Sequence, residues 1–114
     1  MEGLIYQRGD VVTCAPPGDY GKSRPAVVLQ SDLFNATHAS VTLCTVTSHA
    51  AEAALFRITL KPSSGNGLKV ESHAMADKIT TLRRERIGAV IGRLDADDLA
   101  RLESAVMLWL GLKA

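Results

Sequence analysis

Apolar residues between positions 10 and 94 fall into short runs that glycine, proline and polar residues separate. One run alternates: Phe56, Ile58 and Leu60 are apolar and Arg57 and Thr59 are polar, as in a strand with one buried face. The runs interpreted as strands cover residues 11–14, 26–30, 41–47, 55–60, 74–82 and 88–94. Several short strands in so short a chain favour a small barrel over a parallel α/β sheet.

Residues 95–111 carry a helical pattern instead. The carboxylates of Asp95, Asp97 and Asp98 suit the free N–H groups at a helix N-terminus, and Gly111 suits its end. Apolar residues recur at helical spacing along this segment: Leu99, Leu102, Val106 and Trp109. We therefore expect this stripe, Trp109 included, to pack in the core. One helical turn is also expected at residues 31–35, where Ser31 or Asp32 can cap it.

The 114 residues predict a single domain, 1–114, of mainly β (α+β) class with a C-terminal α-helix. The formal net charge is only +1, so nucleic-acid binding would require a local basic patch. Cys14 and Cys44 lack metal-type spacing and are expected to be buried, reduced thiols. The three histidines share no ligand spacing, so no metal is expected. No apolar run approaches a membrane span, and the chain is expected to be cytoplasmic.

Arg24 is the most informative position, because it joins a loop rich in glycine and proline to the apolar run 26–30. The proline that follows it favours an extended arginine. A planar cation at the rim of a rigid strand suits bidentate contact with a phosphate. The alternative is an ordinary arginine that starts a strand and points to water.

An ordered series of motifs resembles the MazF/PemK family of ribonuclease toxins. The motifs run almost from end to end: Arg8–Val12, Gly18–Leu29, Ser31–Asn35, Val41–Ser48, Gly67–Leu68, Ala76–Ile79 and Ile91–Leu94. The resemblance implies a small SH3-like barrel (MazF/PemK/CcdB-like) that forms a homodimer and cleaves single-stranded RNA without a metal or other cofactor. It also implies a cognate antitoxin that silences the toxin.

By position, the resemblance assigns Arg24 and Thr47 as catalytic residues. Asp19 stands five residues before the arginine, where the family often has an acidic residue, and is carried over as a third. The family commonly has glutamine where this chain has Lys78, so the resemblance does not carry the family's base contact over to this position.

The proposed chemistry is attack by an RNA 2′-hydroxyl on its own phosphorus, which leaves a 2′,3′-cyclic phosphate and a 5′-hydroxyl. Arg24 can stabilise the growing charge and Thr47 can add a hydroxyl, but neither is a useful base. His49 would project from the same face as Thr47 if the strand continued, and imidazole suits proton transfer at neutral pH. The alternative for His49 is a solvated residue at the start of a loop.

The remaining candidate substrate contacts lie beside the arginine or in a basic run. Tyr20 can stack on an unpaired base, Lys22 can hold a phosphate, and Ser23 flanks Arg24. Arg83, Arg84 and Arg86, together with Lys78, can border an RNA groove, or they can form a solvated turn.

Two other functions fit the same fold. A CcdB-like poison of DNA gyrase would act through its C-terminal helix, and a catalytically silent barrel would only bind RNA or a protein. Fold alone does not separate these functions, because function resides in the site.

Overall fold

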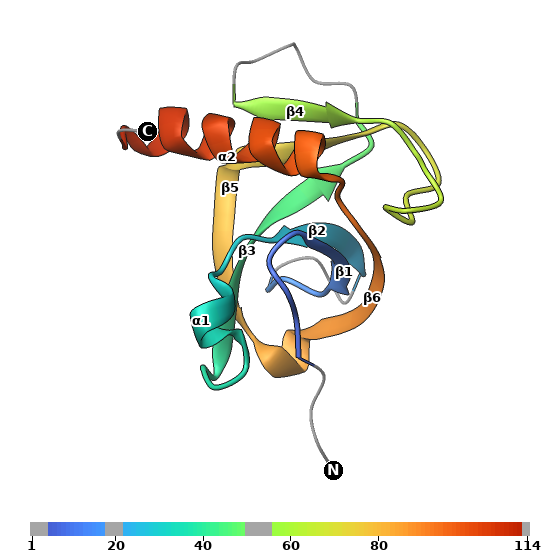
Figure 1. Ribbon diagram of the computed structural model, residues 1–114. Coiled ribbons are helices and arrows are strands. Elements are labelled where there is room, and N and C mark those ends of the chain that lie inside the picture. Colours follow the sequence, from blue (N-terminus) through green and yellow to red (C-terminus); the bar gives the residue numbers. More distant parts are fainter. Residues whose placement is uncertain (1–4, 18–21, 50–55, 113–114) are drawn as a thin grey trace.

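The computed structural model describes residues 5–17, 22–49 and 56–112, in which six strands form one antiparallel sheet (Figure 1). The strands are β1 (Asp10–Cys14), β2 (Arg24–Val28), β3 (Ser40–Thr47), β4 (Arg57–Leu60), β5 (Ser72–Arg83) and β6 (Ile87–Arg93). Their order across the sheet is β4-β5-β3-β2-β1-β6. The sheet curls strongly, but its edge strands β4 and β6 do not pair within the described residues. The predicted α+β class is confirmed, and the barrel is an open one.

Alternation along the central strands buries both faces of the curled sheet. On one face Val11 and Val27 join a cluster that includes Leu102 of the C-terminal helix. On the other face Val12 and Val28 pack with neighbours from the other strands in a second cluster. Successive residues of a strand point to opposite faces, so near-continuous apolar runs such as 26–29 are required here.

The two cysteines lie in different clusters. Cys44 packs beneath the helix and Cys14 packs on the other face of the sheet, and both are buried thiols outside any disulfide. Burial raises the pKa of the Cys44 thiol to about 12. The prediction of buried, reduced cysteines is confirmed.

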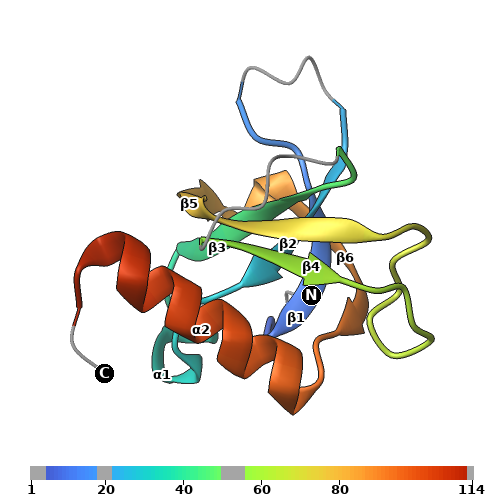
Figure 2. The same ribbon diagram turned by 90° about the horizontal axis from the view of Figure 1, so that it is seen from above.

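The C-terminal helix α2 (Ala96–Leu110) crosses the sheet over β4 and β5 (Figure 2). Asp95 caps its start by accepting a hydrogen bond from the Asp98 N–H at 2.7 Å, and Gly111 ends it in the left-handed conformation. The predicted packing of Trp109 is wrong: its side chain is 49% exposed. The Phe56 ring lies beside it with centroids 5.0 Å apart. The C-terminal end of α2 extends past the edge of the sheet (Figure 1), which leaves this part of the helix without a sheet beneath it.

Two short helices connect the strands. Helix α1 (Asp32–Asn35) is the predicted turn, and the Ser31 hydroxyl accepts a hydrogen bond from the Leu33 N–H at 3.2 Å. The basic run forms the 3-10 helix η1 (Arg84–Arg86) between β5 and β6. Strand β2 begins at Arg24, two residues before the predicted start, because Arg24 pairs with Cys14 of β1.

The loop between β4 and β5 folds around the buried side chain of Asn66. Its carbonyl oxygen accepts hydrogen bonds from the N–H groups of Ser63 and Leu68, both at 3.0 Å. Its amide nitrogen donates to the carbonyl of Lys61 at 2.8 Å. The Asn66 side chain thus satisfies backbone groups of the loop that have no partner in a neighbouring strand, and it holds the loop in one conformation.

This loop docks on β6 backbone to backbone, which two glycines permit. A Cβ on Gly67 would lie 2.0 Å from the carbonyl oxygen of Ile91, and a Cβ on Gly92 would lie 2.3 Å from the carbonyl carbon of Asn66. Gly67 also has a φ of +72°, which disfavours other residues. The Arg93 N–H donates to the Gly65 carbonyl at 2.8 Å across this contact.

We expect Gly92→Ala to lower the free energy of unfolding by about 1–3 kcal/mol, because the added methyl group forces two backbones apart. Urea denaturation of the variant and the wild type measures this change. The matched control is Gly65→Ala, whose Cβ would meet only the Ser63 hydroxyl at 3.8 Å. Equal stabilities of the two variants would contradict the docking argument.

Candidate active site

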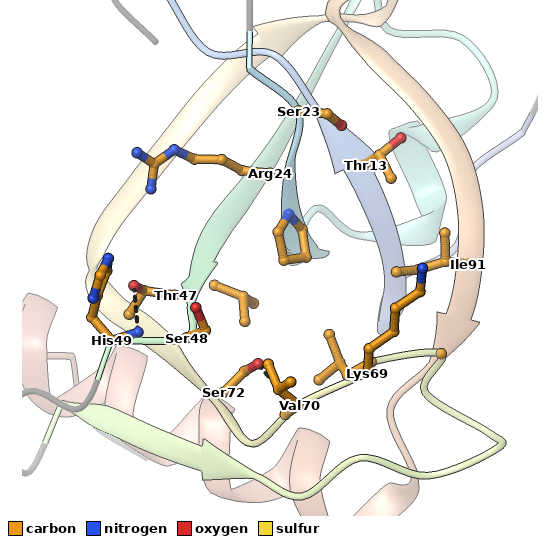
Figure 3. A pocket seen from close by; sticks show the side chains of 14 residues that line it. Thr13, Ser23, Arg24, Thr47, Ser48, His49, Lys69, Val70, Ser72 and Ile91 are labelled. Atoms are coloured by element: carbon orange, nitrogen blue, oxygen red, sulfur yellow. Dashed lines mark hydrogen bonds between the residues drawn. The ribbon is translucent and has the colours of Figure 1, made fainter.

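A pocket of about 400 Å³ opens at the end of the sheet where β2 begins and β3 ends (Figure 3). Its walls come from the ends of β1, β2, β3 and β5, from the docked loop and from β6. The lining residues include Thr13, Ser23, Arg24, Thr47, His49, Lys69, Ser72 and Ile91. This volume lies in the range of small-molecule and nucleotide sites.

Arg24 meets Thr47 here because their strands are antiparallel neighbours. Ala26 pairs with Thr45 at this end of the β2–β3 ladder, and Arg24 and Thr47 each lie two residues beyond that pair. Two candidates separated by a helix and most of a strand in sequence therefore share one wall of the pocket (Figure 3).

Thr47 is the last residue of β3, and its hydroxyl oxygen accepts a hydrogen bond from the backbone N–H of His49 at 3.2 Å. This bond turns the chain after the strand, so His49 does not continue it. The exposed His49 side chain nevertheless lines the same pocket as Thr47. The two candidates come together through a turn, where the sequence had predicted an extended strand.

Arg24 also borders a second hollow of about 330 Å³, which contains Lys78. Apart from these two cations the hollow is lined by uncharged residues: Pro16, Pro17, Thr45, Met75, Ile79 and Thr80. None of the described residues that line either hollow is acidic. The two hollows with Arg24 between them form a surface on which the charge is positive, and we call it the basic groove.

Of the predicted residues in the described part of the loop before Arg24, one lines the pocket. Ser23 lines the pocket, and Lys22 is exposed but lines neither hollow of the groove. Asp19 and Tyr20 lie outside the described residues.

None of the arginines of the basic run lines the groove. Arg84 binds the end of α1 and the segment after it: its Nη2 donates to the Asn35 carbonyl and its Nε donates to the His38 carbonyl at 2.7 Å. Arg86 donates to the Ala15 carbonyl at 3.3 Å and lines a small hollow that Ser23 also borders. Arg83, at the end of β5, is exposed and pairs with Ser40.

The sequence did not identify Thr13, Lys69, Ser72 or Ile91 as residues of this pocket. Lys69 lies in the turn after Gly67 and Ser72 is the first residue of β5, and the sequence marks this stretch only as a break between strands. Thr13 and Ile91 lie on strands whose neighbours are set by the sheet order. No local signal in the sequence places these residues beside Arg24.

Among the described residues, no group of three or more histidine, cysteine, aspartate or glutamate side chains gathers where it would hold a metal ion. None of the helices in that part of the chain is long and apolar enough to cross a membrane.

The fold and the basic groove can now be compared with known proteins. A family model for the PemK-like, MazF-like toxins of type II toxin–antitoxin systems matches residues 7–110. This chain belongs to that toxin family. The resemblance that the ordered motifs predicted is confirmed.

Similar proteins extend over nearly the whole toxin. A probable endoribonuclease MazF of Mycolicibacterium smegmatis is 40% identical over 107 residues, which are 93% of this chain and 97% of that protein. A crystal structure of MazE–MazF from Deinococcus radiodurans has a TM-score of 0.79 and 26% identity, and covers 97% of this chain and 100% of that one. An endoribonuclease in complex with its cognate antitoxin, from a mycobacterial species, has a TM-score of 0.82 at 21% identity over 96% and 98% of the two chains, which shows the same fold.

The hydrogen bonds of Arg84 indicate that this arginine stabilises the fold and does not bind RNA. We expect Arg84→Gln to lower the free energy of unfolding by about 1–2 kcal/mol, because it leaves two backbone carbonyls without their charged donor. We expect RNA cleavage by the folded variant to stay within about twofold of the wild type. Urea denaturation and a cleavage assay measure the two effects, with Arg83→Gln as the exposed control. A large loss of cleavage with unchanged stability would contradict this assignment.

Proposed function

We propose that the basic groove binds single-stranded RNA and that Arg24 holds the phosphate that is cleaved. The observation that carries this proposal is the position of Arg24 between two hollows, each with a lysine and with no acidic side chain among its described lining residues. A polyanion gains affinity from such a surface without a large net charge on the protein. The toxin family and the endoribonuclease names of its curated relatives support the same activity, that of an endoribonuclease toxin.

The proposed reaction is an internal transesterification. The 2′-oxygen forms a bond to phosphorus while the bond from phosphorus to the 5′-oxygen breaks, giving a 2′,3′-cyclic phosphate and a 5′-hydroxyl. One proton leaves the 2′-hydroxyl and one reaches the departing 5′-oxygen. The guanidinium of Arg24 stabilises the charge that grows on the phosphate oxygens, which is the role otherwise filled by a metal.

Thr47 and His49 take complementary parts in this proposal. The Thr47 hydroxyl oxygen already accepts a bond from the His49 N–H, so its own proton is available to a phosphate oxygen. His49 exchanges a proton with the 2′-hydroxyl or the 5′-oxygen, since imidazole changes charge near neutral pH. Asp19 is the second candidate for this proton.

Ser23 and Lys78 are proposed as substrate contacts, because both line the groove. Lys78 replaces the glutamine that is common in the family, so we propose contact with a phosphate at this position. Three further residues are kept as candidate contacts. Arg86 lines a hollow that Ser23 also borders, and Lys22 and Tyr20 are close to Arg24 in the sequence.

The partners proposed for the toxin are a cognate antitoxin, single-stranded RNA in the cytoplasm, and a second copy of the chain. The exposed apolar residues at the end of α2, Met107, Leu108, Trp109 and Leu110, offer surface to a protein partner. A gyrase poison would use this helix for a different target, and a silent binder would lack cleavage altogether.

We expect purified toxin to cut a long single-stranded RNA at selected sites in EDTA, leaving cyclic phosphate ends. We expect Arg24→Ala to slow cleavage at least about 100-fold, because it removes the main stabiliser of the transition-state charge. Gel mapping of the cuts and end-group analysis measure both effects. The matched control is Arg101→Ala, an arginine on α2 outside the groove whose partners are Asp98 and the Thr59 carbonyl.

Cleavage by Arg24→Ala at the wild-type rate would contradict the role of Arg24. Intact RNA with every variant would contradict the nuclease function and favour the gyrase poison or the silent binder. Circular dichroism of Arg24→Ala separates a lost site from a lost fold.

We expect His49→Ala to lower the single-turnover rate and to remove one limb of its pH profile, because a titrating group leaves the site. The loss expected for a general acid or base is about 100-fold or more. His38→Ala, an exposed histidine that does not line the groove, is the control. An unchanged rate and pH profile would exclude His49 from proton transfer.

A further inference from the structure

Lys69 is a pocket residue for which the reaction described above has no role. It lines the same pocket as Arg24, and Figure 3 shows the two side chains on opposite sides of that space. They are the only permanently charged side chains among the pocket's described lining residues. The pocket therefore has a cation on each side.

The Lys69 side chain is available to a ligand. It is exposed, and no hydrogen bond or ion pair to it occurs within the described residues. The neighbouring side chains on its wall, Leu68, Val70 and Ile91, are apolar and do not compensate its charge. An ammonium group in such a setting attracts an anion more strongly than one surrounded by carboxylates.

The backbone of Lys69 is held in place by the docked loop. Leu68, directly before it, is buried in the core, and its N–H donates to Asn66 at 3.0 Å. Gly67 lies against the carbonyl of Ile91. Lys69 is thus presented from an anchored backbone, and binding loses less conformational entropy than it would at a mobile loop.

We propose that Lys69 binds the RNA phosphate next to the one held by Arg24, and so fixes the strand in register for cleavage. This inference rests on the proposed function and adds a contact to it. Two cations on opposite sides of a nucleotide-sized pocket fit successive phosphates of one strand better than a single phosphate. Lys69 is a binding residue in this proposal and takes no part in proton transfer.

The test uses Lys69→Gln and the control Lys61→Gln. Lys61 is an exposed lysine at the start of the same loop, but it lines a different hollow that also contains Asp95 and Asp98. The probe is a labelled RNA oligonucleotide that spans a mapped cut site, with deoxyribose at the cut to prevent cleavage. Its dissociation constant is measured by fluorescence anisotropy over a series of salt concentrations.

We expect Lys69→Gln to flatten the plot of log affinity against log salt by about 0.7, the slope for one phosphate contact on a single strand. Lys61→Gln should keep the wild-type slope. Replacing the flanking phosphate of the RNA by a neutral methylphosphonate should weaken binding to the wild type. The same replacement should leave the affinity of Lys69→Gln for the RNA unchanged, because the variant lacks the side chain that contacts this phosphate. In cleavage assays the variant should raise KM much more than it lowers kcat, because the contact is made before and during the reaction.

An unchanged salt slope, or equal methylphosphonate effects on wild type and Lys69→Gln, would overturn the inference while cleavage by the wild type stands. If the wild type cuts no RNA, the proposed function has failed. In that case the salt dependence of binding to a mixed-sequence single-stranded RNA is measured for the wild type and Lys69→Gln. Equal slopes would then overturn the role of Lys69 in phosphate binding.

Discussion

The contact between the β4–β5 loop and β6 is the constraint on which the candidate site depends. Residues 67 and 92 carry no side chains, so the two backbones approach to a distance that a single methyl group would prevent. Asn66 fixes the loop from inside, and the loop then supplies one wall of the pocket. Without this contact Arg24 and Thr47 would stand at the end of a sheet that is open to water on one side.

The opposite wall follows from antiparallel pairing. Strand β2 starts near the end of β3, and the last residues that pair between them are Ala26 and Thr45. Residues of both strands are buried on both faces of the sheet, which anchors the strand ends that carry Arg24 and Thr47. Rigid strand ends of this kind position side chains more accurately than loops do.

The pairing of charges explains how a chain of net charge +1 has a basic groove. Carboxylates in the described part of the toxin neutralise arginines that hold the structure together. Asp10 pairs with Arg93 at 2.9 Å, and Asp77 pairs with Arg57 at 3.2 Å. These two carboxylates are thereby used outside the groove, and the positive charge of Lys69 and Lys78 is left beside Arg24. Local arrangement, and not composition, creates the site for a polyanion.

The sequence by itself determined the strands and the capped C-terminal helix, and it singled out Arg24 and Thr47 as candidate site residues, because these inferences depend on local periodicity and on motifs within short segments. It misplaced Trp109, since a helical stripe does not reveal where the sheet beneath it ends. Tertiary structure alone decided that Lys69 and Ile91 line the pocket. It also decided that the Arg84 guanidinium donates to the carbonyls of Asn35 and His38. Both results depend on contacts between segments that are far apart in the sequence, which local patterns do not reveal. Gly67 and Gly92, for example, look like ordinary glycines until the β4–β5 loop and β6 are seen in contact.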